Sequence, residues 1–181
     1  MEPIEIIGQA VGIVAMLVVT LSFQGKQQRT IFVMQCVGNL LFAVHFLMIG
    51  ATVGGLLNFI GSIRGAVFYY KDKLKADRLP WFVAFIISYL AVYVLNFTLF
   101  GKETTAFNLI IEFLPVVGMI ALNVGFRLKK AADVRRCGAI ASPAWMIYNA
   151  VLGSWGGFIC DSMSLISIII GMWRHDKKDK E

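Results

Sequence analysis

The sequence contains little charge. Only 15% of its 181 residues are charged, against 58% that are hydrophobic, and its mean hydropathy is +0.73. Soluble domains carry roughly 25% charged residues, and a soluble helical bundle needs polar outer faces that follow the helical period. The apolar stretches of this chain have no such faces. The composition therefore argues against a soluble protein and predicts an integral membrane protein.

The chain is also poor in the residues that build metal and redox sites. It has three cysteines and two histidines, and Cys36, Cys137 and Cys160 show neither Cys-x-x-Cys nor metal-ligand spacing. We interpret the cysteines as small apolar fillers. No nucleophile and base pair and no phosphate-binding loop is recognisable. We therefore expect no enzymatic activity, no cofactor and no metal.

Long apolar stretches recur between short polar breaks. Each stretch is close to or above the ~17 to 20 residues that cross a ~30 Å hydrocarbon core. The segments between them are too short to form a soluble domain. The seven predicted spans are Ile4–Phe23, Ile31–Ile49, Val53–Tyr70, Trp81–Phe100, Ala106–Phe126, Cys137–Leu152 and Phe158–Trp173.

Basic residues are distributed unevenly over the loops. Lysine and arginine in short loops are retained on the cytoplasmic side, and 15 of the 17 basic residues fall on one side of a seven-span topology. This predicts an outside N-terminus and a cytoplasmic C-terminus. The acidic start MEPIE predicts that the first span is not a cleaved signal peptide. The net charge of +6 then points to anionic lipid headgroups of the bilayer as partners, and not to nucleic acid.

A weak internal repeat relates the two halves of the chain. A shift of 103 residues lays spans one to three over spans five to seven without a gap. Rare polar or special positions coincide under this shift: Gln9 with Glu112, Gly12 with Pro115, Asn39 with Ser142, His45 with Tyr148, and Asn58 with Asp161. Arg64 falls opposite Ser167, so its charge is not part of the symmetric pattern. The fourth span has no counterpart under this shift. Because it crosses the membrane once more, the second set of three spans has the same orientation as the first.

We therefore predict an all-helical integral membrane protein with seven transmembrane helices. Two parallel three-helix bundles are joined by a linker helix, a 3+1+3 arrangement. The first repeat covers residues 1–73, the linker with the fourth span 74–103, the second repeat 104–174, and a charged cytoplasmic tail 175–181.

Four segments carry a resemblance to known proteins. They are VHFLMIG (44–50), LLNFIGSIR (56–64), EFLPVVG (112–118) and WMIYNAVLGSWGG (145–157), the last followed by Asp161. These segments resemble the YgjV family of bacterial inner-membrane proteins, and the helix pattern resembles the wider PQ-loop and SWEET superfamily. The resemblance implies a bacterial cytoplasmic membrane location, with the N-terminus periplasmic. From the superfamily it also implies transport of a small solute.

The resemblance further implies a substrate pocket and hinges. The superfamily pocket is lined by spans two, three, six and seven, which corresponds here to Asn39, Asn58, Ser142 and Asp161. The four hinge prolines of SWEET proteins correspond to Pro115 and Pro143, with Gly12 and Leu40 at the other two positions. Where the superfamily has Pro-Gln, this chain has Phe23-Gln24 and Phe126-Arg127.

Charged residues within a span are functional or paired, because each costs roughly 2.5–3.5 kcal/mol to insert. Arg64 either extends to the lipid headgroups or forms a charge pair with Glu112. Glu112 is either held ionised by that pair or, without a cation, serves in proton coupling. Pro115 removes a backbone donor and favours a hinge. The alternative for Glu112 and Pro115 is a static interhelical hydrogen bond at a kink.

The other polar side chains in the spans are candidate substrate ligands, each with a structural alternative. Asn58 and Asp161 bind substrate or contact interfacial water. His45, which could titrate near neutral pH, and Tyr148 are ligands or interfacial anchors. Trp145 stacks on a sugar or a cation or fills the core. The remaining candidates, which otherwise form interhelical hydrogen bonds, are Gln9, Asn39, Ser142 and Asn149.

We expect a transporter that moves a small polar solute by alternating access to a central site. The acidic residues favour a cation, an amine-bearing metabolite or proton coupling, and nothing in the sequence selects among them. The alternative is a non-transporting membrane receptor or scaffold that holds a ligand or a partner protein. Assembly into a homo-oligomer is left open.

Overall fold

The computed structural model describes residues 3–48, 52–151 and 155–176, and all regular structure in these ranges is helical. The predicted span ends at Ile49 and Leu152, and residues 177–181 of the predicted tail, lie outside the described residues. The helices are α1 (Pro3–Ser22), α2 (Gln28–Met48), α3 (Thr52–Tyr69), α4 (Lys71–Leu74), α5 (Leu79–Thr98), α6 (Ala106–Arg127), α7 (Ala131–Val151), α8 (Trp155–Gly171) and the π-helical turn η1 (Met172–Asp176).

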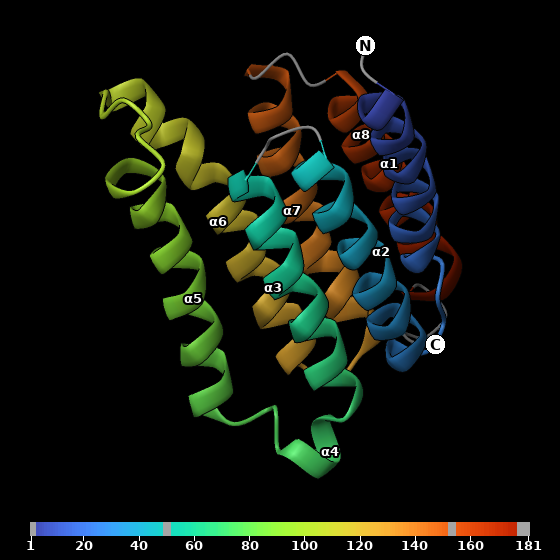
Figure 1. Ribbon diagram of the computed structural model, residues 1–181. Coiled ribbons are helices and arrows are strands. Elements are labelled where there is room, and N and C mark those ends of the chain that lie inside the picture. Colours follow the sequence, from blue (N-terminus) through green and yellow to red (C-terminus); the bar gives the residue numbers. More distant parts are fainter. Residues whose placement is uncertain (1–2, 49–51, 152–154, 177–181) are drawn as a thin grey trace.

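The long helices run up and down a single bundle (Figure 1). In the first half α2 packs between α1 and α3, and in the second half α7 packs between α6 and α8. Helix α5 lies at the edge of the bundle against α3 and α6. The two halves also meet directly, through contacts of α1 with α8, α3 with α6 and α2 with α7.

Local sequence explains where several helices begin. Thr105 caps α6, because its side chain accepts a hydrogen bond from the backbone N–H of Asn108, as preferred at this position. Helix α5 has a proline in its first turn, where the missing N–H costs nothing. Helix α7 begins at Ala131, well before the predicted Cys137. Its first turn is polar, and hydropathy alone did not show that the helix extends into it.

Apolar side chains cover the outside of the bundle, and polar side chains lie within it. Ile87, Ile110 and Ile166 are among the most exposed large hydrophobic residues, whereas Arg64 and Asn149 are buried. Within the described residues, four helical segments are long and apolar enough to cross a membrane: α2, α5, α6 and Gly157–Asp176. Helix α1 contributes the shorter apolar stretch Ile6–Ser22. Such an apolar exterior suits lipid and not water.

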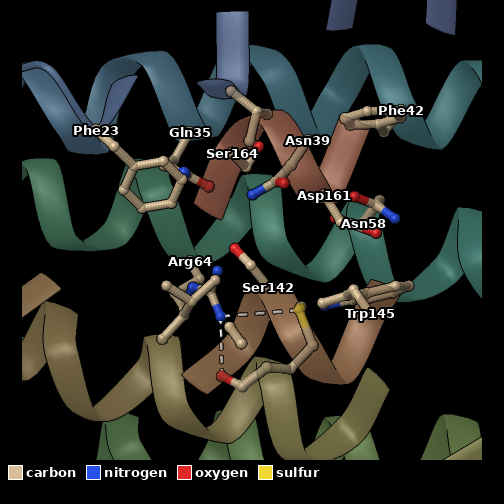
Figure 2. A pocket seen from close by; sticks show the side chains of 14 residues that line it. Phe23, Gln35, Asn39, Phe42, Asn58, Arg64, Ser142, Trp145, Asp161 and Ser164 are labelled. Atoms are coloured by element: carbon tan, nitrogen blue, oxygen red, sulfur yellow. Dashed lines mark hydrogen bonds between the residues drawn. The ribbon is translucent and has the colours of Figure 1, made fainter. Parts of the chain in front are cut away.

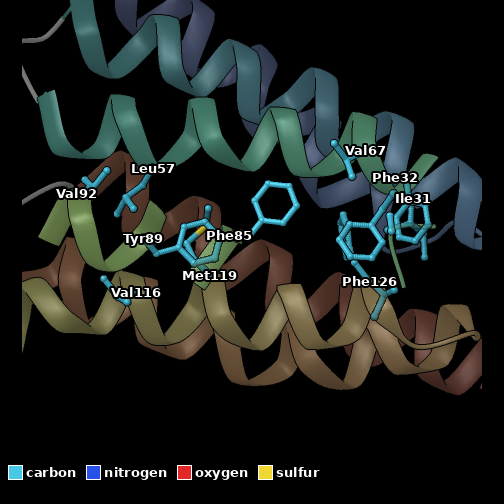
Figure 3. Close-up of a cluster of buried hydrophobic side chains, with 13 residues drawn as sticks. Ile31, Phe32, Leu57, Val67, Phe85, Tyr89, Val92, Val116, Met119 and Phe126 are labelled. Atoms are coloured by element: carbon cyan, nitrogen blue, oxygen red, sulfur yellow. The ribbon is translucent and has the colours of Figure 1, made fainter. Parts of the chain in front are cut away.

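A cluster of aromatic rings fills the core between α2, α3, α5 and α6 (Figure 3). The ring of Phe126 lies 4.5 Å from that of Phe32 and 5.7 Å from that of Phe68. Phe68 stacks on Phe85 of α5, which in turn stacks on Tyr89. The fourth predicted span is therefore attached to the bundle by its aromatic face. This face also supplies one wall around Arg64.

Candidate solute-binding site

A cavity of about 80 Å³ lies where the two halves meet. Figure 2 shows its polar lining in an otherwise apolar bundle. All six helices of the two groups contribute side chains, and α5 contributes none. The lining residues are Val19, Phe23, Gln35, Asn39, Phe42, Asn58, Arg64, Met119, Leu122, Ala141, Ser142, Trp145, Asp161 and Ser164. At roughly 30 Å³ for each water, this volume corresponds to two or three water molecules.

The structure brings half of the ten candidate substrate ligands to this cavity. Asn39, Asn58, Ser142, Trp145 and Asp161 all line it, including the four residues that the superfamily resemblance implied. On α2 the lining residues Gln35, Asn39 and Phe42 are three or four positions apart, which places them on one face of that helix. The five predicted ligands that line the cavity come from α2, α3, α7 and α8, so the site depends on the packing of the two halves.

Close helix approach brings the amide of Asn39 toward α3. A Cβ atom added to Gly61 would lie 2.9 Å from Asn39 Nδ2, so only glycine leaves room for this side chain. Asn39 Nδ2 is buried and has no hydrogen-bond partner among the described residues. The amide of Asn58 is instead satisfied within α3, where Nδ2 donates to the carbonyl of Gly54 at 2.9 Å. The cavity therefore holds one amide donor that is free for a ligand.

Asp161 is the acidic residue of the cavity lining. Its Oδ2 atom accepts a hydrogen bond of 2.8 Å from Asn149 Nδ2, which places the candidate Asn149 behind the lining. Asn149 packs closely on α8, because a Cβ atom at Gly157 would lie 2.6 Å from its side chain. Among the described residues, no lysine or arginine pairs with Asp161. Its carboxyl group is therefore oriented by an amide and not neutralised by a cation.

Arg64 is completely buried, with 0% of its surface exposed. Its Nη1 atom donates to the carbonyl of Met119 at 3.1 Å and to the hydroxyl of Tyr89 at 3.2 Å. The guanidinium carbon lies 4.8 Å from the centre of the Phe126 ring, within cation–π range. Nε and Nη2 have no partner in the described part of the chain.

Both sequence interpretations of Arg64 are corrected by this environment. The side chain does not extend to the headgroups, because it is enclosed between α3, α5 and α6. It does not pair with Glu112, because Glu112 forms its ion pair with Lys102 and no ion pair of the described residues includes Arg64. Hydropathy placed Arg64 within a helix but could not show which helices surround it.

Glu112 lies outside the cavity lining and has a different cation. Its Oε1 atom is 3.1 Å from Lys102 Nζ, and Oε2 accepts a hydrogen bond of 3.4 Å from the hydroxyl of Tyr148. The expected pair with Arg64 is therefore wrong, and so is the premise of a carboxyl group without a nearby cation. Tyr148 also contacts the ring of Trp145, with centroids 5.9 Å apart. Glu112 thus reaches the cavity only indirectly.

Three predicted residues of the first half lie on α1 and α2, and two of them, His45 and Gly12, are in contact. His45 Nδ1 donates to the carbonyl of Gly8 at 2.8 Å, and its ring lies on Gly12, where an added Cβ would be 2.7 Å away. Gln9 is exposed on the outer face. None of the three lines the cavity. Helices α6 and α7 continue through the predicted hinge residues Pro115 and Pro143.

Two polar residues of the lining, Gln35 and Ser164, were not predicted from the sequence as ligands. Gln35 lies one helical turn before Asn39 on the same face of α2, and its Nε2 donates to Ser22 at 2.9 Å. Ser164 lies three positions after Asp161 and is 3.1 Å from the hydroxyl of Thr20 on α1. Helical spacing from the predicted ligands was the signal that could have found both.

An apolar exterior around a polar centre defines this protein as a polytopic helical membrane protein. The model of the Imp-YgjV family, described as bacterial inner membrane protein, matches residues 6–179, and the chain belongs to this family. It is 25% identical over 175 residues to the inner membrane protein YgjV of Escherichia coli strain K12, covering 95% of this chain and 87% of that protein. No solved structure matches the chain. The predicted family and the bacterial inner membrane location are thereby confirmed.

Proposed function

We propose that this protein transports a small polar solute by alternating access, with the central cavity as its binding site. The observation that carries this proposal is the position of the cavity. Polar side chains of four helices reach it, it lies where the two halves meet, and all six helices of the two halves line it. A relative movement of the two halves would open such a site to one end of the bundle or the other.

The proposal includes the 3+1+3 arrangement and its relationship to the PQ-loop and SWEET superfamily. Supporting it, α1, α2 and α3 begin 103 residues before α6, α7 and α8, respectively. The contacts between the halves are also related in this way, because the pair α1 and α8 is equivalent to the pair α6 and α3. Arg64 donates to the Met119 carbonyl on α6. Its equivalent Ser167 donates to α1 at 2.6 Å, to the carbonyl of Thr20, which lies one turn after Met16, the equivalent of Met119.

We further propose that the end of the bundle that contains α4 is cytoplasmic. Hydrogen bonds tie its loops together: Lys71 donates to Gln28 at 2.7 Å, Gln28 to Leu128 at 2.7 Å, and Arg127 to Asp77 at 2.7 Å. This end carries most of the described basic residues, as expected from retention of positive charge. Lys102 belongs to the opposite end. Single cysteines at positions 102 and 129, in a variant without the native cysteines, should be labelled from outside and from inside, respectively.

The transport test uses purified protein in proteoliposomes with a panel of labelled polar solutes. We expect uptake of at least one solute above that of empty liposomes, and loss of that uptake in Asn39→Leu, which removes the polar amide at nearly constant volume. Gln9→Leu is the matched control, since Gln9 is an exposed polar residue of the same bundle. Uptake that is unchanged in Asn39→Leu would refute the central site. Specific binding without uptake would favour the receptor alternative.

A further inference from the structure

We propose that the central cavity recognises a small zwitterion, binding its carboxylate at Arg64 and its ammonium group at Asp161. This inference rests on the proposed function in taking the cavity as the solute site, and it names the class of solute. The class is an amino acid of the size of glycine or alanine. Two groups of opposite charge carry the argument, because Arg64 and Asp161 both line the cavity and neither has an ion-pair partner among the described residues.

The free edge of Arg64 fits a carboxylate. A guanidinium carries its N–H donors in a fixed planar fork, and two adjacent nitrogens can donate in parallel to the two oxygens of one carboxylate. Nη1 is occupied by Met119 and Tyr89, whereas Nε and Nη2, which form one edge of the fork, have no partner in the described residues. The packing therefore fixes the guanidinium at one nitrogen and leaves a two-donor edge available.

A purely structural role does not explain that edge. An arginine that only linked α3 to α6 and α5 would need the Nη1 contacts alone, and a neutral donor would supply them without burying a charge. The face of Phe126 stabilises the guanidinium in part. No carboxylate of the described chain reaches it. A buried charge without a counterion is unfavourable, so a ligand anion is the partner that this environment lacks.

Asp161 supplies the complementary charge at a separate place on the wall. Figure 2 shows Arg64 and Asp161 apart around the cavity, and the two do not form an ion pair with each other. Asn149 orients the Asp161 carboxylate through one oxygen. A simple anion would bind Arg64 but be repelled by Asp161. A simple cation would bind Asp161 but be repelled by Arg64. A zwitterion satisfies both charges.

The size and walls of the cavity favour the smallest members of this class. About 80 Å³ is the share of two or three waters, which leaves little space for a side chain. Trp145 and Phe42 form apolar parts of the wall, and the free amide of Asn39 offers one additional donor. A sugar of many hydroxyl groups would leave both charged residues without a counterion.

The test compares four probes of similar size: alanine, propionate, ethylamine and glycerol. Their affinities for the purified protein are measured by calorimetry and by thermal stabilisation, since a ligand that binds the folded state raises its apparent stability. We expect alanine to bind at least tenfold more tightly than each of the other three. Equal binding of propionate, tighter binding of glycerol, or no binding of alanine would overturn the inference.

Substitutions then test which residue binds the ammonium group of the ligand and which binds its carboxylate. Asp161→Asn should remove the preference for alanine over propionate, and Arg64→Lys, which keeps the charge but loses the two-donor edge, should weaken alanine binding at least tenfold. Arg29→Gln is the matched control, because Arg29 is an exposed cation that pairs with Asp72 at 2.9 Å, away from the cavity. If Arg64→Lys does not fold, the Asp161→Asn result alone decides, because an unchanged probe order there refutes the site.

Failure of this inference can be distinguished from failure of the proposed function. Binding of alanine without uptake into proteoliposomes would retain the zwitterion site and refute transport. Uptake of a different solute that depends on Asn39, together with no binding of alanine, would retain transport and refute the zwitterion site.

Discussion

The ion pair between Lys102 and Glu112 has one partner inside the bundle and one near its surface, so its two partners should respond differently to removal. The side chain of Glu112 is 5% exposed and that of Lys102 is 34% exposed. Lys102→Met leaves a buried carboxylate whose remaining polar contact among the described residues is the hydroxyl of Tyr148. Glu112→Gln instead leaves a lysine that can turn to water, and the glutamine amide keeps a polar contact to Tyr148.

Removing one partner of a fully buried pair costs about 3–5 kcal/mol, and partial exposure of Lys102 reduces this to about 1–3 kcal/mol for Lys102→Met through solvent screening. We expect Glu112→Gln to cost less than about 1 kcal/mol, on the scale of one neutral hydrogen bond. The double variant should resemble Glu112→Gln, because the lysine has no further role once the carboxylate is gone.

The assay is reversible unfolding of the purified protein in a detergent and lipid mixture, with all four members of the double-mutant cycle measured together. Lys73→Met is the control for loss of a positive charge, because Lys73 is exposed and should change stability by no more than about 0.5 kcal/mol. Equal costs for the two single variants, or additive costs in the double variant, would refute the assigned geometry.

Three further predictions concern helix packing, capping and surface charge. Gly65→Ala should destabilise the contact of α2 with α3 by about 1–3 kcal/mol, since the new Cβ would lie 2.8 Å from Cys36 Cβ; unchanged unfolding would contradict this packing. Thr105→Ala should cost about 1 kcal/mol through loss of the α6 cap, with Thr105→Ser as a control that retains the hydroxyl. Asp72→Asn should change stability by less than about 1 kcal/mol, because its partner Arg29 is 65% exposed and Asp72 73%; a larger loss in the same unfolding assay would show that this pair is not a surface contact.

Much of the helix pattern was predictable because lipid imposes a simple rule on sequence. A helix that faces lipid must be long and apolar, and the predicted Ala106–Phe126 differs from α6 (Ala106–Arg127) by one residue. The rule fails where a helix extends beyond its apolar part. Helix α7 contains Asp133 and Arg135 in its first turns, and the predicted start at Cys137 was therefore late.

The candidate site was predictable only in part. Asn39, Ser142 and Asp161 were identifiable as rare polar residues within apolar helices, and they do line one cavity. The partners of the charged residues were not identifiable. Arg64 lies against α5 and α6, and Glu112 is reached by a lysine of the loop before α6. Both depend on how elements distant in sequence pack.

The sequence by itself determined the class of the protein and the polar positions within its helices, because both follow from local composition and spacing. Its family followed from the resemblance of four segments to known proteins, which the family comparison confirmed. Only the tertiary structure decided which polar groups are already satisfied. It assigned Lys102 to Glu112. Among the described residues it left Nε and Nη2 of Arg64 and Nδ2 of Asn39 without partners, in a cavity that Asp161 also lines. The physical reason is that the pairing of a buried charge depends on the groups that lie next to it in space. In this bundle those groups come from different helices of both halves.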